Sequence, residues 1–211
     1  MADIKPKCRL YLQLPGGPAA KLEAELAQAL ARADIACVSL GRGGTALDEN
    51  YADRLINLAQ AAGTACLIED DVELAERLGA DGVHLVTADP EAYRKARALL
   101  GGEANIGAYC AFSRHAAMLL AELGADYVGF GPSSPDDIDG IARCAELIAW
   151  WGETFVVPCV AFNIDGIDAA RELATLGADF VAPSQAIWRE EDAVNRIAGI
   201  GRAISEVRRA A

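Results

Sequence analysis

The stretch Leu78-Gly79-Ala80-Asp81-Gly82-Val83-His84-Leu85 returns twice further along the chain, as Leu123–Phe130 and Leu176–Pro183. A looser copy ends at Asp34 and leads into the apolar run Ile35–Leu40. Each copy closes a helical pattern, turns at or near a small residue and enters a short β-branched or aromatic run. Glycine supplies the left-handed backbone that ends many helices, and Asp is favoured in the short loop that follows. The repeat therefore predicts four similar helix-to-strand junctions.

The spacing of these copies predicts the number of strands. Two successive intervals are 45 residues (78 to 123) and 53 residues (123 to 176), which leaves room for two strand–helix units per copy and eight in total. The expected strands are Arg9–Leu14, Ile35–Leu40, Ala65–Glu69, Gly82–Leu85, Asn105–Tyr109, Tyr127–Phe130, Val156–Phe162 and Phe180–Pro183. The expected helices are Pro18–Arg32, Asn50–Ala62, Asp71–Leu78, Pro90–Leu100, Ser113–Leu123, Gly140–Trp151, Gly166–Leu176 and Glu190–Arg209.

Strict alternation of strands and helices predicts a parallel sheet covered by helices. Eight units in 211 residues predict one (β/α)₈ TIM barrel that spans residues 1–211 as a single domain. An open, doubly wound sheet is the alternative. It would place a glycine-rich phosphate turn after the first strand, where Leu14–Pro18 instead contains two prolines.

Charge and apolar content exclude several classes of partner. The net charge is −12, from 31 acidic and 19 basic residues, and no basic run is present to bind nucleic acid or an anionic membrane surface. Residues Met1–Lys7 lack the apolar stretch of a signal peptide, and no run approaches the roughly 20 apolar residues of a membrane span. Six widely spaced cysteines without a CxxC pair predict buried, reduced thiols, and so a cytoplasmic protein.

The active site of such a barrel lies at the carboxyl ends of its strands. Glu69, Asp70, Asp71 and Asp89 bring several carboxylates to two of these ends, where Mg²⁺ would relieve their repulsion. Helix capping by Asp70 or Asp71, and by Asp89 before Pro90, is the competing interpretation. Both remain open at this point.

Anions have two candidate sites among the strand ends. Asn163, Gly166, Ser184 and Gln185 follow the last two strands, the usual phosphate site of such barrels, although an ordinary polar loop is equally compatible. Arg42, in a glycine-rich turn, could contact a second anionic group. His84 is expected to be a satisfied structural side chain and His115 a surface one. Trp150-Trp151 predicts packing, with a subunit contact in a homodimer as the alternative.

Several of these stretches resemble the thiamine phosphate synthase family and its thiazole tautomerase relatives. The matching motifs are Ala80–Leu85, Gly124–Pro132 and Val157–Ala161, together with Leu10–Leu12 and Ile68–Ala75 in the same order. The resemblance implies a Mg²⁺-dependent transferase of thiamine biosynthesis, which joins hydroxymethylpyrimidine diphosphate to thiazole phosphate and releases pyrophosphate. It implies that Asp70 and Asp89 hold the metal. The strand-end residues taken as contacts to a phosphorylated substrate are Arg42, Glu69, Cys110, Gly131, Asn163, Ser184 and Gln185.

The resemblance stops at several substrate-binding positions. The family's Gln-x-Arg-x-Lys pattern is Ser39–Gly43 here, Glu69 replaces an Asn, and Asp136, Asp137 and Asp139 stand where the family has Thr and Lys. We therefore expect thiamine phosphate synthesis that is reduced or lost, unless Arg42 and Arg114 replace the missing bases. The alternatives are a tautomerase-like isomerase, with Phe112 at the expected histidine, and a barrel that binds another small ligand.

Overall fold

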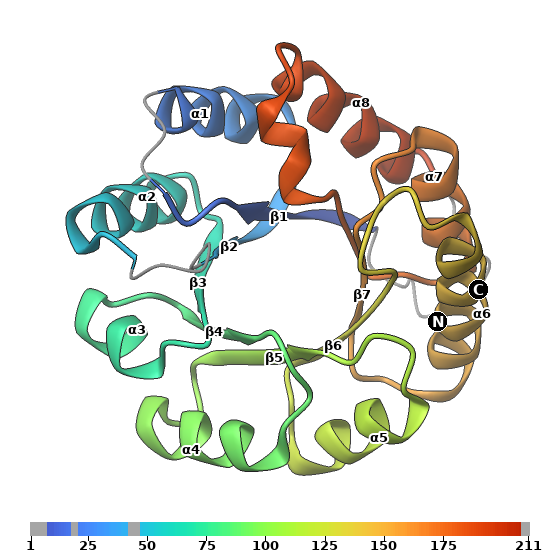
Figure 1. Ribbon diagram of the computed structural model, residues 1–211, viewed down its shortest axis with the longest axis horizontal. Helices are drawn as coiled ribbons and strands as arrows, with labels where there is room; N and C mark the ends of the chain where they lie inside the picture. Colours follow the sequence, from blue (N-terminus) through green and yellow to red (C-terminus); the bar gives the residue numbers. More distant parts are fainter. Residues whose placement is uncertain (1–7, 18–20, 42–46, 208–211) are drawn as a thin grey trace, which may run out of the picture.

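Eight parallel strands close into a barrel in the order β1 to β8, with the helices outside it, in the computed structural model (Figure 1). The structure describes residues 8–17, 21–41 and 47–207. The strands are β1 (Arg9–Leu14), β2 (Ile35–Leu40), β3 (Ala65–Glu69), β4 (Gly82–Leu85), β5 (Asn105–Tyr109), β6 (Tyr127–Phe130), β7 (Cys159–Phe162) and β8 (Phe180–Ala182). The helices are α1 (Leu22–Arg32), α2 (Glu49–Ala61), α3 (Val72–Leu78), α4 (Pro90–Leu100), α5 (Arg114–Leu123), α6 (Ile138–Thr154), α7 (Ile167–Leu176) and α8 (Ala193–Ser205), with a 3₁₀ helix η1 (Gln185–Arg189) after β8. The predicted (β/α)₈ fold is confirmed.

The repeated Asp links the two strands in three of the four pairs of units. Asp81 accepts the backbone N–H of Cys66 at 2.7 Å, and Asp126 accepts that of Ile106 at 2.7 Å. Asp179 accepts that of Cys159 at 2.9 Å, so the carboxylate before an even-numbered strand binds the preceding odd-numbered strand in three pairs. The glycines before these residues adopt the positive φ that ends α3, α5 and α7. The sequence repeat is thus a repeated hydrogen-bond junction.

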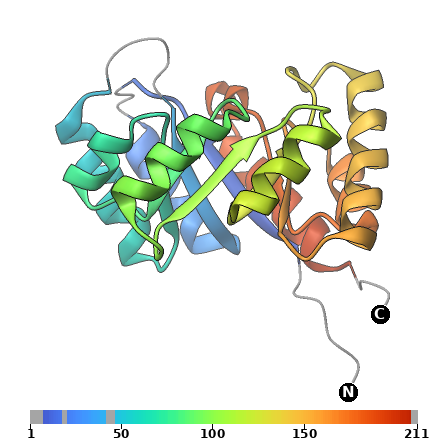
Figure 2. The ribbon, with the colours of Figure 1, turned by 90° about the horizontal axis from the view of Figure 1, so that it is seen from below.

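The two faces of each strand are buried against different neighbours. Residues that point outward, such as Leu10, Leu12 and Val128, pack against the surrounding helices in the main core. Residues that point inward, such as Tyr11, Leu67 and Phe162, form a second cluster inside the barrel. The strands point toward the upper edge of the side view in Figure 2, so the loops that follow them gather at that edge.

Within the described residues, several element bounds differ from the sequence prediction by a residue, and β7, α6 and α8 differ by more. β7 begins at Cys159 rather than Val156, whose side chain is fully exposed, and Pro158 has no N–H for a ladder. α8 begins at Ala193 rather than Glu190, because the separate 3₁₀ helix η1 precedes it. α6 extends on both sides of the predicted range, from Ile138 to Thr154, with Asp137 as its N-cap.

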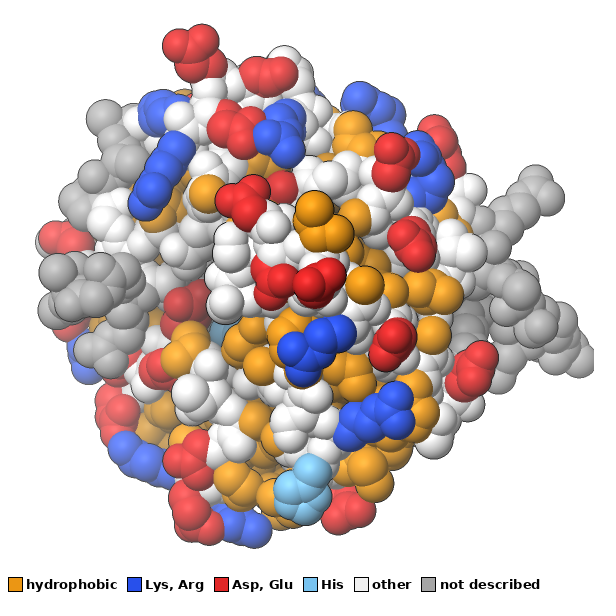
Figure 3. All heavy atoms as spheres, turned by 45° about the vertical axis from the view of Figure 1, so that its right-hand side comes forward, with side chains coloured by type: hydrophobic (Ala, Val, Ile, Leu, Met, Phe, Trp, Pro, Cys, Tyr) orange, Lys and Arg blue, Asp and Glu red, His pale blue; other side chains and the backbone are white. Residues whose placement is uncertain are grey.

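The cysteines and the helices agree with the expectations from composition. All six cysteines are free thiols, and five of them are buried. Within the described ranges, no helix is both long and apolar enough to cross a membrane. Acidic and basic side chains alternate over the face in Figure 3, without a continuous basic patch on its described part.

Candidate functional site

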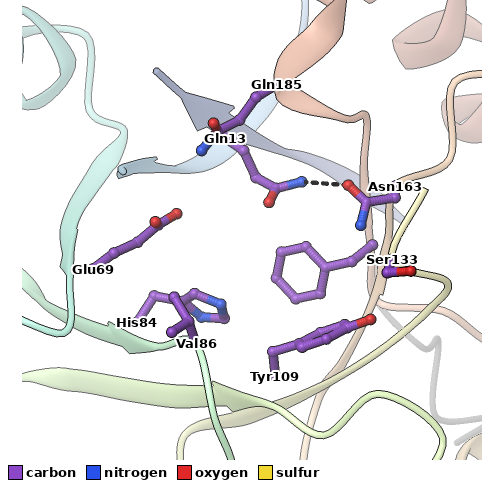
Figure 4. A pocket seen from close by; sticks show the side chains of 9 residues that line it. Gln13, Glu69, His84, Val86, Tyr109, Ser133, Asn163 and Gln185 are labelled. Atoms are coloured by element: carbon purple, nitrogen blue, oxygen red, sulfur yellow. Dashed lines mark hydrogen bonds between the residues drawn. The ribbon is translucent and has the colours of Figure 1, made fainter. Parts of the chain in front are cut away.

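A cavity of about 240 Å³ opens at the carboxyl ends of the strands. Its side chains come from opposite sides of the barrel and converge on one space (Figure 4). The lining residues are Gln13, Glu69, His84, Val86, Tyr109, Ser133, Phe162, Asn163 and Gln185. The predicted Glu69, Asn163 and Gln185 are therefore brought together. No Lys or Arg of the described chain lines the cavity.

Glu69 supplies the negative charge of the cavity. It is the last residue of β3, and its Oε1 accepts the Ser39 hydroxyl at 3.2 Å. Burial, opposed by the Ser39 hydrogen bond and assisted by the neighbouring Asp70 carboxylate, raises the pKa of the Glu69 carboxyl to about 7. Near neutral pH this group can therefore accept or release a proton.

His84 joins the cavity to the interior of the barrel. Its Nδ1 is hydrogen-bonded to the Tyr127 hydroxyl at 2.7 Å, and that hydroxyl lies 3.2 Å from the Tyr11 hydroxyl. Burial lowers the pKa of His84 to about 3, so the imidazole stays neutral at physiological pH. The expectation of a satisfied structural histidine is confirmed, and the side chain also lines the cavity.

Amide and aromatic side chains form the opposite wall. Asn163, whose φ is 61°, donates from Nδ2 to the Pro132 carbonyl at 2.8 Å. Gln13 donates to the Pro183 carbonyl at 3.1 Å. Phe162 and Tyr109 meet edge to face with their centroids 5.8 Å apart, and the Tyr109 hydroxyl donates to the Gly131 carbonyl at 2.7 Å. These contacts fix the amide groups of Gln13 and Asn163 and the rings of Tyr109 and Phe162 around the cavity.

Ser184, a predicted phosphate contact, is already bound to a carboxylate. Its backbone N–H donates to Asp165 Oδ1 at 2.6 Å, and its hydroxyl donates to Asp165 Oδ2 at 2.7 Å. Ser184 is 5% exposed. An internal anion thus takes two of the donors that a phosphate at this strand end would use.

The predicted metal ligands act as acceptors for backbone N–H groups. Asp70 Oδ1 accepts the Val86 N–H at 3.0 Å, and Asp89 Oδ1 accepts the Glu91 N–H at 2.9 Å as the N-cap of α4. Asp71, not Asp70, is the N-cap of α3. In the described chain no three His, Cys, Asp or Glu side chains converge as a metal site, although the second oxygen of Asp70 and of Asp89 has no described donor. One or two carboxylates suffice for Mg²⁺ when a phosphate completes its shell.

Two other predicted contacts lie outside the cavity lining, and a third is not described. Arg42 falls outside the described residues. Cys110 is buried outside the cavity lining, and burial raises the pKa of its thiol to about 12. Gly131 approaches the β7 backbone so closely that a Cβ there would lie 2.3 Å from the Phe162 carbonyl oxygen. Neither Cys110 nor Gly131 lines the cavity.

The charged residues expected near the substrate, Arg114 and the three acids before and at the start of α6, lie outside the cavity lining. Arg114 lies over the Trp150 ring, with its guanidinium carbon 4.5 Å from the ring centroid. Asp137 caps α6 through the Gly140 N–H at 2.9 Å, while Asp136 and Asp139 are exposed. Neither Arg114 nor these acids line the cavity.

Gln13, Tyr109 and Phe162 line the cavity from within β1, β5 and β7, whereas site residues were expected chiefly in the loops after the strands. Strand alternation carries the signal that was overlooked. In β1, Tyr11 and Gln13 share the inward face, and a polar Gln there has no place in an apolar core. The two-residue alternation of side chains along β1 therefore indicates that Gln13 faces the inside of the barrel.

The sequence model of the thiamine monophosphate synthase family matches residues 11–187. This chain belongs to that family. It is 40% identical over 210 residues to the thiamine-phosphate synthase of Rhodospirillum centenum, covering 96% of this chain and 97% of that protein. It is 39% identical over 201 residues to the thiamine-phosphate synthase of Hyphomonas neptunium, covering 90% of each.

Solved structures share the fold of this thiamine monophosphate synthase family member. Thiamine phosphate pyrophosphorylase from Pyrococcus furiosus superposes with a TM-score of 0.76 at 22% identity, over 93% of this chain and 96% of that one. The GGGPS of Thermoplasma volcanium superposes with a TM-score of 0.71 at 16% identity, over 97% and 95%. At such identities the likeness shows the barrel alone.

Proposed function

We propose that this protein is a divergent thiamine phosphate synthase that forms thiamine phosphate slowly or not at all. The family reaction breaks the C–O bond between the pyrimidine methylene and the diphosphate, and pyrophosphate leaves with the bonding electrons. The lone pair of the thiazole nitrogen then forms the new C–N bond. Both substrates are anionic, so the site must supply hydrogen-bond donors and positive charge.

The charge of the cavity supports this proposal. Within the described residues, its only charged lining group is Glu69, and the neutral His84 adds no positive charge. Two like charges 4 Å apart repel by about 4 kcal/mol at an effective dielectric constant of 20. A diphosphate that enters beside an ionised Glu69 meets repulsion where the family reaction needs attraction.

The contact between Ser184 and Asp165 carries the proposal. Two donors of 2.6 and 2.7 Å are already satisfied by a carboxylate, so a substrate phosphate has to displace that group to reach them. Removing one donor from a reacting anion costs about 10²–10³ in rate. Asp165 occupies two donors, and the family's basic side chains are absent at several positions. Together these two features support very slow turnover.

Magnesium fits this proposal as a cofactor held by Asp70 and Asp89. Each keeps one carboxylate oxygen without a described donor, and Mg²⁺ usually binds through one or two carboxylates and a substrate phosphate. When bound, the ion would neutralise charge on the leaving pyrophosphate. Asp70 directly follows Glu69 in the chain, and the two carboxylates repel each other. A bound Mg²⁺ would reduce this repulsion.

Pyrophosphate release from the two substrates with Mg²⁺ tests the proposal. The Rhodospirillum centenum relative serves as the positive control, and an Asp70→Ala variant as the negative one. We expect a wild-type rate close to that of the variant and far below ~1 s⁻¹, the lower end of ordinary enzyme turnover. A rate near ~1 s⁻¹ that disappears in Asp70→Ala would overturn the proposal and support an active synthase.

A further inference from the structure

We infer that the cavity at the carboxyl end of the barrel binds a small, planar aromatic cation without a phosphate group, with Glu69 as its counter-ion. The inference concerns the same cavity as the proposed function, but it does not depend on the loss of the family reaction. The inference rests on three observations: the chemistry of the cavity lining, the position of the Glu69 carboxylate and the size of the cavity.

The carboxylate of Glu69 has one oxygen available to a ligand. Oε1 accepts the Ser39 hydroxyl at 3.2 Å, whereas no described residue donates to Oε2. Oε2 lies beside Gly41, where an added Cβ would be 3.0 Å from it and 2.6 Å from Gln185 Nε2. The missing Cβ at Gly41 lets the Glu69 carboxylate and the Gln185 amide pack closely against this backbone. Glu69 also lines the cavity, and from that side a donor on a ligand can reach its carboxylate (Figure 4).

The walls of the cavity favour a flat ring that carries positive charge. Phe162 lies at the centre of the aromatic contacts, with Tyr109 5.8 Å away edge to face and His84 5.1 Å away at 41°. Aromatic faces attract cations, and such contacts strengthen when water is excluded. The neutral imidazole of His84 does not repel a cation. Amide groups of Gln13, Asn163 and Gln185 line the rim and can bind the polar edge of the ring.

Size limits the ligand to about one ring. Pockets for drug-sized molecules typically enclose about 300–1,000 Å³, and this cavity encloses about 240 Å³. A single aromatic ring with an amidine-type edge would place two N–H donors on the same side as its charge. That edge matches the free oxygen of Glu69 and leaves the ring face for Phe162.

Three probes of matched shape test the inference: benzamidine (cationic), benzamide (neutral) and benzoate (anionic). Calorimetry on the full chain at pH 8, without Mg²⁺, should give benzamidine at least about tenfold tighter binding than benzamide, and no binding of benzoate. Chemical-shift changes should cluster on Glu69, Tyr109 and Phe162.

Two variants separate charge from shape. Glu69→Gln keeps the volume and should reduce benzamidine affinity to that of benzamide. Gly41→Ala keeps the charge but places a Cβ against Gln185 and Glu69, and should weaken both probes. Urea unfolding checks that each variant is folded. Equal affinity for benzamide and benzamidine, unchanged binding by Glu69→Gln, or no binding at about 10 mM would each overturn the inference. Preferred binding of benzoate would overturn it too and point to a basic group such as Arg42.

Discussion

The carboxylate of Asp165 accepts two hydrogen bonds from the single residue Ser184, one from its backbone N–H and one from its hydroxyl. The two residues follow β7 and β8, the strand ends where (β/α)₈ barrels commonly bind phosphate. The Asp165 carboxylate therefore accepts the hydrogen bonds that Ser184 could otherwise donate to a bound anion.

Replacing Asp165 with Ala should free both donors of Ser184. We expect the free energy of unfolding to fall by about 2 kcal/mol, because charge-assisted hydrogen bonds are lost. Inorganic phosphate at about 10 mM should then raise the melting temperature of the variant but not of the wild type. Asp168→Ala removes the same charge from an exposed position on α7 and should change neither property. Equal effects of phosphate on all three proteins would contradict this prediction.

Glu69 should make stability depend on pH. Its pKa is about 7 in the folded chain and 4.5 as the reference for an unfolded one, so the folded state binds the proton more tightly. Its contribution to stability is fully present below pH 4.5 and is lost as the pH rises through 7. Glu69→Gln should therefore be more stable than the wild type at pH 8, by on the order of 2 kcal/mol, and similar to it near pH 4.5. Urea unfolding of both proteins at several pH values measures the difference. A constant difference across that range would exclude the mechanism.

Asp81 should stabilise the junction between β3 and β4. Its Oδ2 accepts the Cys66 N–H at 2.7 Å and the Gln60 side-chain amide at 3.1 Å. Asp81→Ala leaves a strand N–H without its acceptor and should cost about 1–3 kcal/mol. Asp81→Asn retains an oxygen and should cost less than half as much. If chemical denaturation finds the two variants equally unstable, the hydrogen bond is not the source of the effect.

Adjacent tryptophans should differ sharply in their contribution to stability. Trp151 is fully buried, stacks on Phe155 with centroids 4.0 Å apart, and donates to the Val157 carbonyl at 2.7 Å. Trp151→Ala should cost about 3–5 kcal/mol because it opens a cavity in the core. Trp150 is half-buried, and Trp150→Ala should cost roughly 1 kcal/mol, chiefly through its contact with Arg114. Circular dichroism during urea unfolding compares the two, and similar losses would contradict the difference in burial.

The sequence by itself determined the barrel. The recurring Gly-Ala-Asp element sets the chain reversal through local backbone preferences, and its spacing counts the strands without knowledge of any distant contact. The regions of Glu69, Asn163 and Gln185 could be placed at one mouth for the same reason, since parallel strands of a closed barrel all end on one side.

Tertiary structure alone decided what these residues do there. Nothing near Ser184 in the sequence indicates that Asp165, nineteen positions earlier, satisfies its donors, because that contact exists only when β7 and β8 lie side by side. The raised pKa of Glu69 and the lowered pKa of His84 likewise follow from burial, and burial depends on every strand around them. Local preference fixes where the chain turns, whereas charge and hydrogen bonding at the site depend on neighbours that only the closed barrel brings together.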